Sequence, residues 1–178
     1  MTIVTSLSAV AIPKMSQFYK AKEIDRINNL VSKSFLLVSF IAFPVAVGLA
    51  CLSPTFVPLF FGAEFGGTII PLMILSLLIV VIGLNNISCT QILIGLGYDR
   101  LFFYSVSIGT ISNFLLNQIL IPTWEAIGAS VASVCAEILV LGSSLWYVYR
   151  KTPLHLKVSW LDYSSHYAVP YSFCRRCC

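Results

Sequence analysis

Long apolar segments alternate with short polar ones along this chain. Four of them are long enough to form membrane-spanning helices, and together they contain one charged residue: 34–52, 69–94, 101–121 and 126–149. An α-helix of nineteen residues, the length of the first segment, extends about 28 Å, roughly the thickness of a hydrocarbon core. The pattern therefore predicts an all-α integral membrane protein with four transmembrane helices.

The segments outside these spans predict the remaining organisation. Residues 1–12 are apolar but lack the basic region and cleavage site of a secretory signal, so we interpret them as the end of a fifth, truncated transmembrane helix. Residues 13–33 are basic, with apolar positions at helical spacing, and predict an amphipathic linker along the cytoplasmic interface. Residues 152–178 are expected to form a disordered cytoplasmic tail. Pro44 should kink the first span, and Pro122 should end the third.

Basic residues are confined to alternate connections. The eleven lysines and arginines fall into three stretches: Lys14, Lys20, Lys22, Arg26 and Lys33; Arg100; and Arg150, Lys151, Lys157, Arg175 and Arg176. The two intervening connections, 53–68 and 122–125, carry only glutamates as charged residues. Because cytoplasmic loops are enriched in lysine and arginine, this alternation predicts a multi-pass protein of the plasma membrane with a cytoplasmic C-terminus.

Composition excludes several other classes. The chain is 58% apolar and 10% charged, whereas an average soluble domain has roughly 25% charged residues. The net charge of +4 is explained by the cytoplasmic side, so no nucleic-acid partner is expected. Of the six cysteines, Cys51, Cys89 and Cys135 fall within or at the ends of apolar segments, and Cys174, Cys177 and Cys178 lie in the tail without a fourth metal ligand. No catalytic motif occurs, and we expect no cofactor, no metal and no enzyme activity.

Polar side chains recur at helical spacing inside the predicted spans. In the third span Ser105, Gly109, Asn113 and Asn117 share one helix face. In the fourth span Glu137 is the one charged residue, and an acidic side chain at the bilayer centre costs about 2.5–3.5 kcal/mol unless it faces protein or water. Asn113, Asn117 and Glu137 are therefore the candidate cavity-lining residues. The alternative for Glu137 is structural: a protonated acid bonded to Asn113, Asn117 or a backbone carbonyl.

Several stretches resemble a known family. SLSAVAIPKMS (6–16), NNLVSKSFLLVSFIAFPVAVGLA (28–50), FVPLFFGAEF (56–65) and NFLLNQILIPTWEAIGASVAS (113–133) are similar to the C-terminal portion of bacterial oligosaccharide flippases. These are the exporters of O-antigen and capsule repeat units in lipopolysaccharide and polysaccharide biosynthesis. They share a superfamily with multidrug and toxin extrusion proteins and with the lipid II flippase.

The resemblance implies a fold and a function. It implies two pseudo-symmetric six-helix lobes around a polar cavity, with alternating access to the two sides of the membrane. This chain would then form an incomplete C-terminal lobe, with the N-terminal lobe as its missing partner. Where the family usually has a basic and an aromatic residue after 121–122, this chain has Thr123, Trp124 and Glu125.

The leading functional hypothesis is a fragment of a flippase for undecaprenyl-diphosphate-linked oligosaccharide repeat units in the bacterial inner membrane. Two alternatives stay open. The first is a cation-coupled multidrug exporter of the same fold, which would be expected to carry more intramembrane carboxylates than Glu137 alone. The second is a non-transporting remnant of a truncated or frameshifted gene, which inserts into the membrane without binding substrate.

Overall fold

The computed structural model describes residues 2–152, and these residues are helical almost throughout. The elements are α1 (Thr2–Lys20), α2 (Ile24–Phe61), the 3₁₀ helix η1 (Ala63–Thr68), α3 (Ile69–Asn85), the π-helix η2 (Asn86–Ile94) and α4 (Asp99–Lys151). The all-helical prediction is confirmed for the described part of the chain, which contains no strand. The predicted tail lies, from residue 153 onward, outside the described residues.

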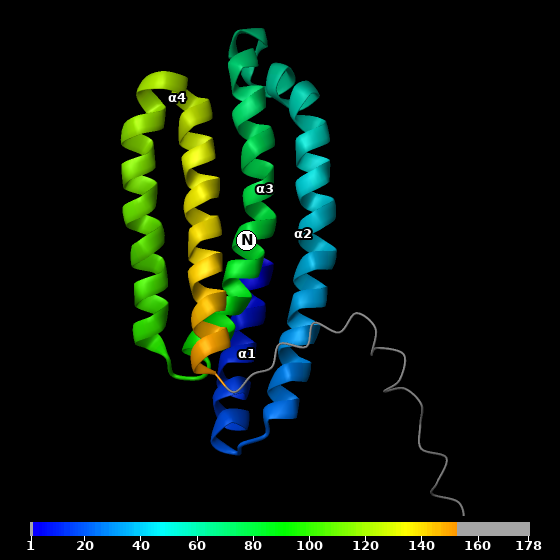
Figure 1. Cartoon of the computed structure of the whole chain (residues 1–178). Helices are drawn as coiled ribbons and strands as arrows, with labels where there is room; N and C mark the ends of the chain where they lie inside the picture. Colours follow the sequence, from blue (N-terminus) through cyan, green and yellow to red (C-terminus); the bar gives the residue numbers. More distant parts are fainter. Residues whose placement is uncertain (1, 153–178) are drawn as a thin grey trace, which may run out of the picture.

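The helices form an elongated bundle in which α4 is a hairpin. Figure 1 shows α2, α3 and the two arms of α4 side by side, while the shorter α1 packs beside η2 and α2. The arms of α4 meet at Glu125, whose φ of 47° and ψ of −122° are not helical. Pro122 lies one turn earlier and lacks the backbone N–H that a straight helix would need there. The chain therefore reverses its direction at this bend.

Three helical segments are long and apolar enough to cross a membrane: Ile24–Phe61, Glu64–Ile94 and Asp99–Lys151. The sequence had predicted four such helices and the end of a fifth. The number differs because α4, with 53 residues, contains both the third and the fourth predicted segments. One non-helical residue, Glu125, separates its two arms, which run in opposite directions and correspond to the two predicted segments (Figure 1).

α2 is longer at both ends than the predicted span 34–52. It continues past Pro54 and Pro58, although proline removes a backbone donor from a helix. The carbonyl of Ala50, four residues before Pro54, accepts a hydrogen bond from Ser53 Oγ at 2.8 Å. The hydroxyl thus replaces the N–H that Pro54 lacks, which explains how the helix persists in an apolar environment.

The basic linker predicted for residues 13–33 is distributed over two helices. α1 extends to Lys20, and α2 begins at Ile24 after a tight turn in which Lys22 adopts a φ of 59°. Arg26 forms an ion pair with Glu23 at 3.2 Å at the start of α2. Both flanking helices extend into this segment, and α1 does so although Pro13 lies within it.

Large apolar side chains are more often exposed than buried. The buried cluster is small and lies where α1, α2, η2 and the end of α4 meet, and its members are Met15, Ile27, Val31, Val38, Ile87, Ile92, Leu93, Leu96 and Val148. By contrast, Phe40 is 78% exposed and Leu59 is 77% exposed. In α2 only 17% of the most apolar window is buried inside the structure. Such a surface is stable in lipid and not in water.

The end of α1, the turn before α4 and the end of α4 meet at one end of the bundle. The hydroxyl of Tyr19, near the end of α1, lies 3.3 Å from that of Tyr98, in the turn between η2 and α4. Tyr98 Oη also donates to the carbonyl of Lys151, at the end of α4, at 3.3 Å. The connection Gly62–Thr68 and the bend at Glu125 lie at the opposite end (Figure 1). The basic stretches before α2, before α4 and at the end of α4 are therefore on the same side.

Candidate functional site

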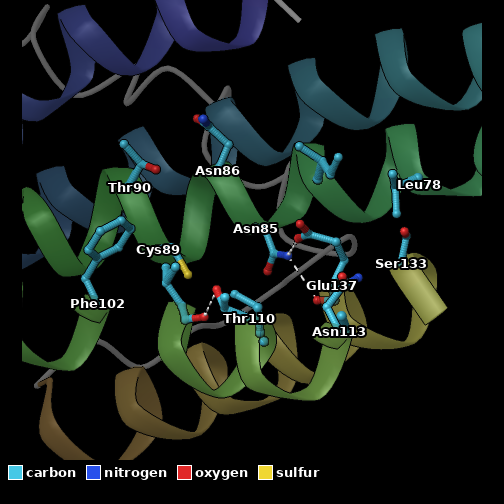
Figure 2. A pocket seen from close by; sticks show the side chains of 15 residues that line it. Leu78, Asn85, Asn86, Cys89, Thr90, Phe102, Thr110, Asn113, Ser133 and Glu137 are labelled. Atoms are coloured by element: carbon cyan, nitrogen blue, oxygen red, sulfur yellow. Dashed lines mark hydrogen bonds between the residues drawn. The ribbon is translucent and has the colours of Figure 1, made fainter. Parts of the chain in front are cut away.

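α3 continues directly into η2, and the two together are called the α3–η2 rod below. An open pocket of about 500 Å³ lies between this rod and the two arms of α4. Figure 2 shows polar side chains from all three helical segments converging on it. Its lining residues are Leu78, Ile82, Asn85, Asn86, Cys89, Thr90, Phe102, Val106, Gly109, Thr110, Asn113, Ser133, Ala136, Glu137 and Val140. The pocket thus combines apolar walls with amide, hydroxyl and carboxyl groups, as sites for polar ligands do.

Asn85 and Glu137 form the central polar contact of this pocket. Asn85 Nδ2 donates to Glu137 Oε2 at 2.5 Å and to the Glu137 backbone carbonyl at 3.0 Å (Figure 2). Asn85 is buried, and its Oδ1 has no hydrogen-bond partner among the described residues. One asparagine therefore fixes both the position of the second arm of α4 and the direction of its carboxylate.

The three candidate residues have different places in the structure. Asn113 and Glu137 both line the pocket, whereas Asn117 is not among its lining residues. Asn117 Nδ2 donates to Asn113 Oδ1 at 2.8 Å, as the spacing of four residues on one helix face allows. Asn117 therefore orients the Asn113 amide from one turn away.

The sequence reasoning missed the importance of Asn85. Its structural alternative for Glu137 was a bond to Asn113, Asn117 or a backbone carbonyl, whereas the side chain that bonds to the carboxyl group is Asn85. The available signal was an amide near the middle of a predicted span, since a polar group in lipid needs a partner. The pairing itself depends on how α3 packs against the second arm of α4, which no spacing within one helix reveals.

Small residues let the walls approach each other. A Cβ atom at Gly109, on the first arm of α4, would overlap Val140 Cγ2 on the second arm. A Cβ at Gly83 would lie 2.8 Å from Val38 Cγ1 of α2. Close approach of backbones at small residues is the usual basis of helix association in lipid. These contacts bring the two arms of α4 together, and they bring α3 close to α2.

Polar contacts continue along η2 on two sides. Ser144 Oγ, on α4, donates to Ser88 Oγ at 3.0 Å. On the side of α1, Ser8 Oγ donates to Asn86 Oδ1, and Gln91 Nε2 donates to Ser8 Oγ at 3.1 Å. η2 is thus bonded through side chains to α4 on one side and to α1 on the other.

The chemistry of the pocket is that of binding. Glu137 is its one carboxylate, and its lining residues include no lysine or arginine. Among the described residues no group of three histidine, cysteine, aspartate or glutamate side chains is placed to hold a metal ion. The amides, hydroxyls and carboxylate are suited to hydroxyl-rich or amide-bearing ligands, which accept and donate hydrogen bonds.

A helical bundle with an apolar surface and a polar pocket between its helices has the architecture of a multi-pass membrane protein. The sequence model of the lipid II flippase MurJ family matches residues 2–175. The chain belongs to this family. The superfamily indicated by the sequence resemblance is thereby confirmed, and the matched family is one of lipid II flippases. The polysaccharide branch of that superfamily stays a prediction.

Three similar proteins are also described as membrane proteins. The chain is similar to the uncharacterized membrane protein YabM of Bacillus subtilis, with 27% identity over 88% of this chain and 28% of that protein. It is also similar to the uncharacterized membrane proteins MJ1375 and MJ1068 of Methanocaldococcus jannaschii, with 26% and 24% identity over 80% of this chain. It covers 33% and 28% of their lengths, so it spans about a third or less of all three relatives. No solved structure matches the chain significantly.

Proposed function

We propose that this chain forms part of a flippase that moves a polyprenyl-diphosphate-linked saccharide across the bacterial plasma membrane. The observation that carries the proposal is the polar pocket around Asn85 and Glu137 inside a bundle with an apolar surface. A polar headgroup needs a polar path through the membrane, while its prenyl tail is stable in lipid. Membership of a lipid II flippase family supports the same substrate class.

The proposed topology has four crossings. α2, the α3–η2 rod and the two arms of α4 would each cross once, and α1 would pack beside them. The end that joins Tyr19, Tyr98 and Lys151 would face the cytoplasm, because the basic stretches lie beside it. The connection Gly62–Thr68 and the bend at Glu125 would then face outward, and residues beyond Lys151 would be cytoplasmic.

The pocket would contact the sugar and not the diphosphate. Asn113 and Glu137 line it, and Asn85 fixes the carboxylate that accepts hydrogen bonds from sugar hydroxyls. A diphosphate would require cations, and the lining residues include none. Asn117 would contribute indirectly, because it orients the Asn113 amide through a hydrogen bond. The diphosphate would be bound by cations outside this pocket, either at the basic end or on a separate N-terminal lobe that supplies the opposite wall.

Two saccharides fit this chemistry, and genetics distinguishes them. The full-length gene product is expressed in one strain depleted of its lipid II flippase and in another that lacks its O-antigen repeat-unit flippase. Survival of the first strain would identify lipid II, and restored O-antigen display in the second would identify an oligosaccharide repeat unit. Rescue of neither strain, with the protein present in the membrane, would contradict the proposal and favour a non-transporting remnant. Sodium-dependent drug efflux would favour the multidrug alternative.

A further inference from the structure

We propose that Ser8, Asn86 and Gln91 form a positioning cluster that keeps η2 π-helical and so sets the shape of the pocket wall. This proposal rests on the proposed function, because the pocket wall that η2 forms is the one assigned to the sugar. The effect of α1 on the conformation of η2 can be tested without a transport substrate.

The cluster is buried between α1 and η2. Ser8 is 2% exposed and Gln91 is fully buried. Ser8 Oγ donates to Asn86 Oδ1 and accepts from Gln91 Nε2 at 3.1 Å. Gln91 Oε1 has no partner in the described part of the chain. The bond to Ser8 therefore satisfies the donor side of the buried Gln91 amide, and its loss would leave the whole amide without a partner.

Both bonds to one hydroxyl require the π-helical geometry. Asn86 and Gln91 are five residues apart, the interval between hydrogen-bonded residues in a π-helix. At roughly 4.4 residues per turn, residues five apart differ in direction by about 50°. At 3.6 residues per turn the same pair would differ by about 140°, on nearly opposite sides of the helix. Ser8 could not then bond to both.

α1 also packs tightly against the end of η2. A Cβ atom at Gly95 would lie 3.1 Å from Met15 Cβ and would overlap the Gln91 carbonyl oxygen. Met15 is fully buried in the cluster of apolar side chains at this end. α1 therefore contacts η2 at its beginning, middle and end, which fixes the whole π-helical segment from one side.

The conformation of η2 decides which side chains reach the pocket. Asn85, Asn86, Cys89 and Thr90 line the pocket and lie at the start of η2 or within it. Figure 2 shows Asn85 directed to Glu137 and Asn86 directed to the other side of the rod. An α-helical η2 would rotate Cys89 and Thr90 relative to Asn85 by tens of degrees. Contacts made by α1 thus determine the wall that faces the ligand.

Cys89 provides the test, because it is 4% exposed and lies within η2. The other five cysteines are replaced by alanine, and the rate of Cys89 modification by a small methanethiosulfonate reagent is measured in membranes. Loss of the bonds in Ser8→Ala is expected to raise this rate about fivefold, as the partial loss of a buried hydrogen-bonded arrangement implies. Gln91→Met, of similar size, is expected to do the same, and Ser8→Thr to restore the slow rate.

Ser105→Ala is the matched control. Ser105 is a buried serine like Ser8, but its hydroxyl donates to the Leu101 carbonyl of its own helix at 3.1 Å and it does not line the pocket. This variant is expected to leave Cys89 as slow as in the parent. An unchanged rate in both Ser8→Ala and Gln91→Met, or an equal rise in Ser105→Ala, would overturn the inference. Because the readout needs no substrate, it stands apart from the rescue experiments that test the flippase function.

Discussion

Glu137 illustrates what a single residue reveals. Its charge in an apolar segment marks it from sequence as a group that needs a partner. The structure supplies that partner as Asn85, two helices away, and not as either asparagine of the preceding span. The pairing ties α3 to the second arm of α4 at the centre of the pocket. This geometry is compatible with both hypotheses for Glu137, a ligand contact and a structural hydrogen bond.

Removal of the Asn85 amide should weaken the bundle. Interhelical hydrogen bonds in membranes contribute about 0.6 kcal/mol on average and up to about 1.7 kcal/mol. Since Asn85 Nδ2 makes two such bonds, Asn85→Ala is expected to lower the free energy of unfolding by about 1 kcal/mol. Titration with sodium dodecyl sulfate in mixed micelles measures this. The exposed Asn29→Ala is the control, and equal stability of the two variants would contradict the assignment.

Gly109 should tolerate no side chain. An alanine Cβ there would overlap Val140 Cγ2, and overpacking of a tight contact costs about 1–3 kcal/mol. Gly142 lies in the same hairpin with no atom within 4 Å of a built Cβ. We expect Gly109→Ala to be destabilised in the same micelle titration and Gly142→Ala to be at least as stable as the parent. Similar losses in both variants would show that the arms are not closely packed at Gly109.

Among the helices, α2 differs most from its predicted limits. The predicted span was 34–52, whereas α2 continues past Pro54 and Pro58, although proline normally breaks a helix. The structure continues to Phe61, with Ser53 Oγ satisfying the carbonyl that Pro54 leaves free. The local sequence contains both residues, but the compensation becomes evident only once the hydrogen bond is known. Helix limits in lipid therefore depend on side-chain donors as well as on proline positions.

Ser53 and Pro54 should act as an energetic pair. Ser53→Ala is expected to reduce the free energy of unfolding by about 1 kcal/mol, because it leaves the Ala50 carbonyl without a donor. In a Pro54→Ala background the restored N–H can bond that carbonyl, so the same serine substitution should have little effect. A double-mutant cycle measures the difference. Additive effects of the two substitutions would contradict this account of the helix.

The whole bundle has one basic and one acidic end. The connections that carry lysine and arginine meet through Tyr19, Tyr98 and Lys151, and the two other connections lie opposite (Figure 1). This separation spans elements distant in sequence, and it follows from the odd and even order of the crossings. With an odd number of crossings between the basic stretches, basic and acidic connections would lie at the same end of the bundle.

Thiol labelling in intact cells should resolve the orientation. In a protein without native cysteines, Glu64→Cys and Glu125→Cys are expected to react with a membrane-impermeant maleimide. Lys22→Cys should react only after the membrane is permeabilised, because basic connections stay in the cytoplasm. Labelling of Lys22→Cys in intact cells would invert the proposed topology. Labelling of Glu64→Cys but not of Glu125→Cys would contradict the crossings assigned to both arms of α4.

The helical class, the approximate position of each apolar segment and the separation of basic from acidic connections follow from local pattern, because hydrophobicity and charge act residue by residue in a bilayer. Two features could not be predicted from the chain: the π-helical form of η2 and the bond of Asn85 to Glu137. Each of these depends on which faces of distant helices meet. Glu137 was identified from its cost in lipid, whereas its partner and the pocket around it arise from packing.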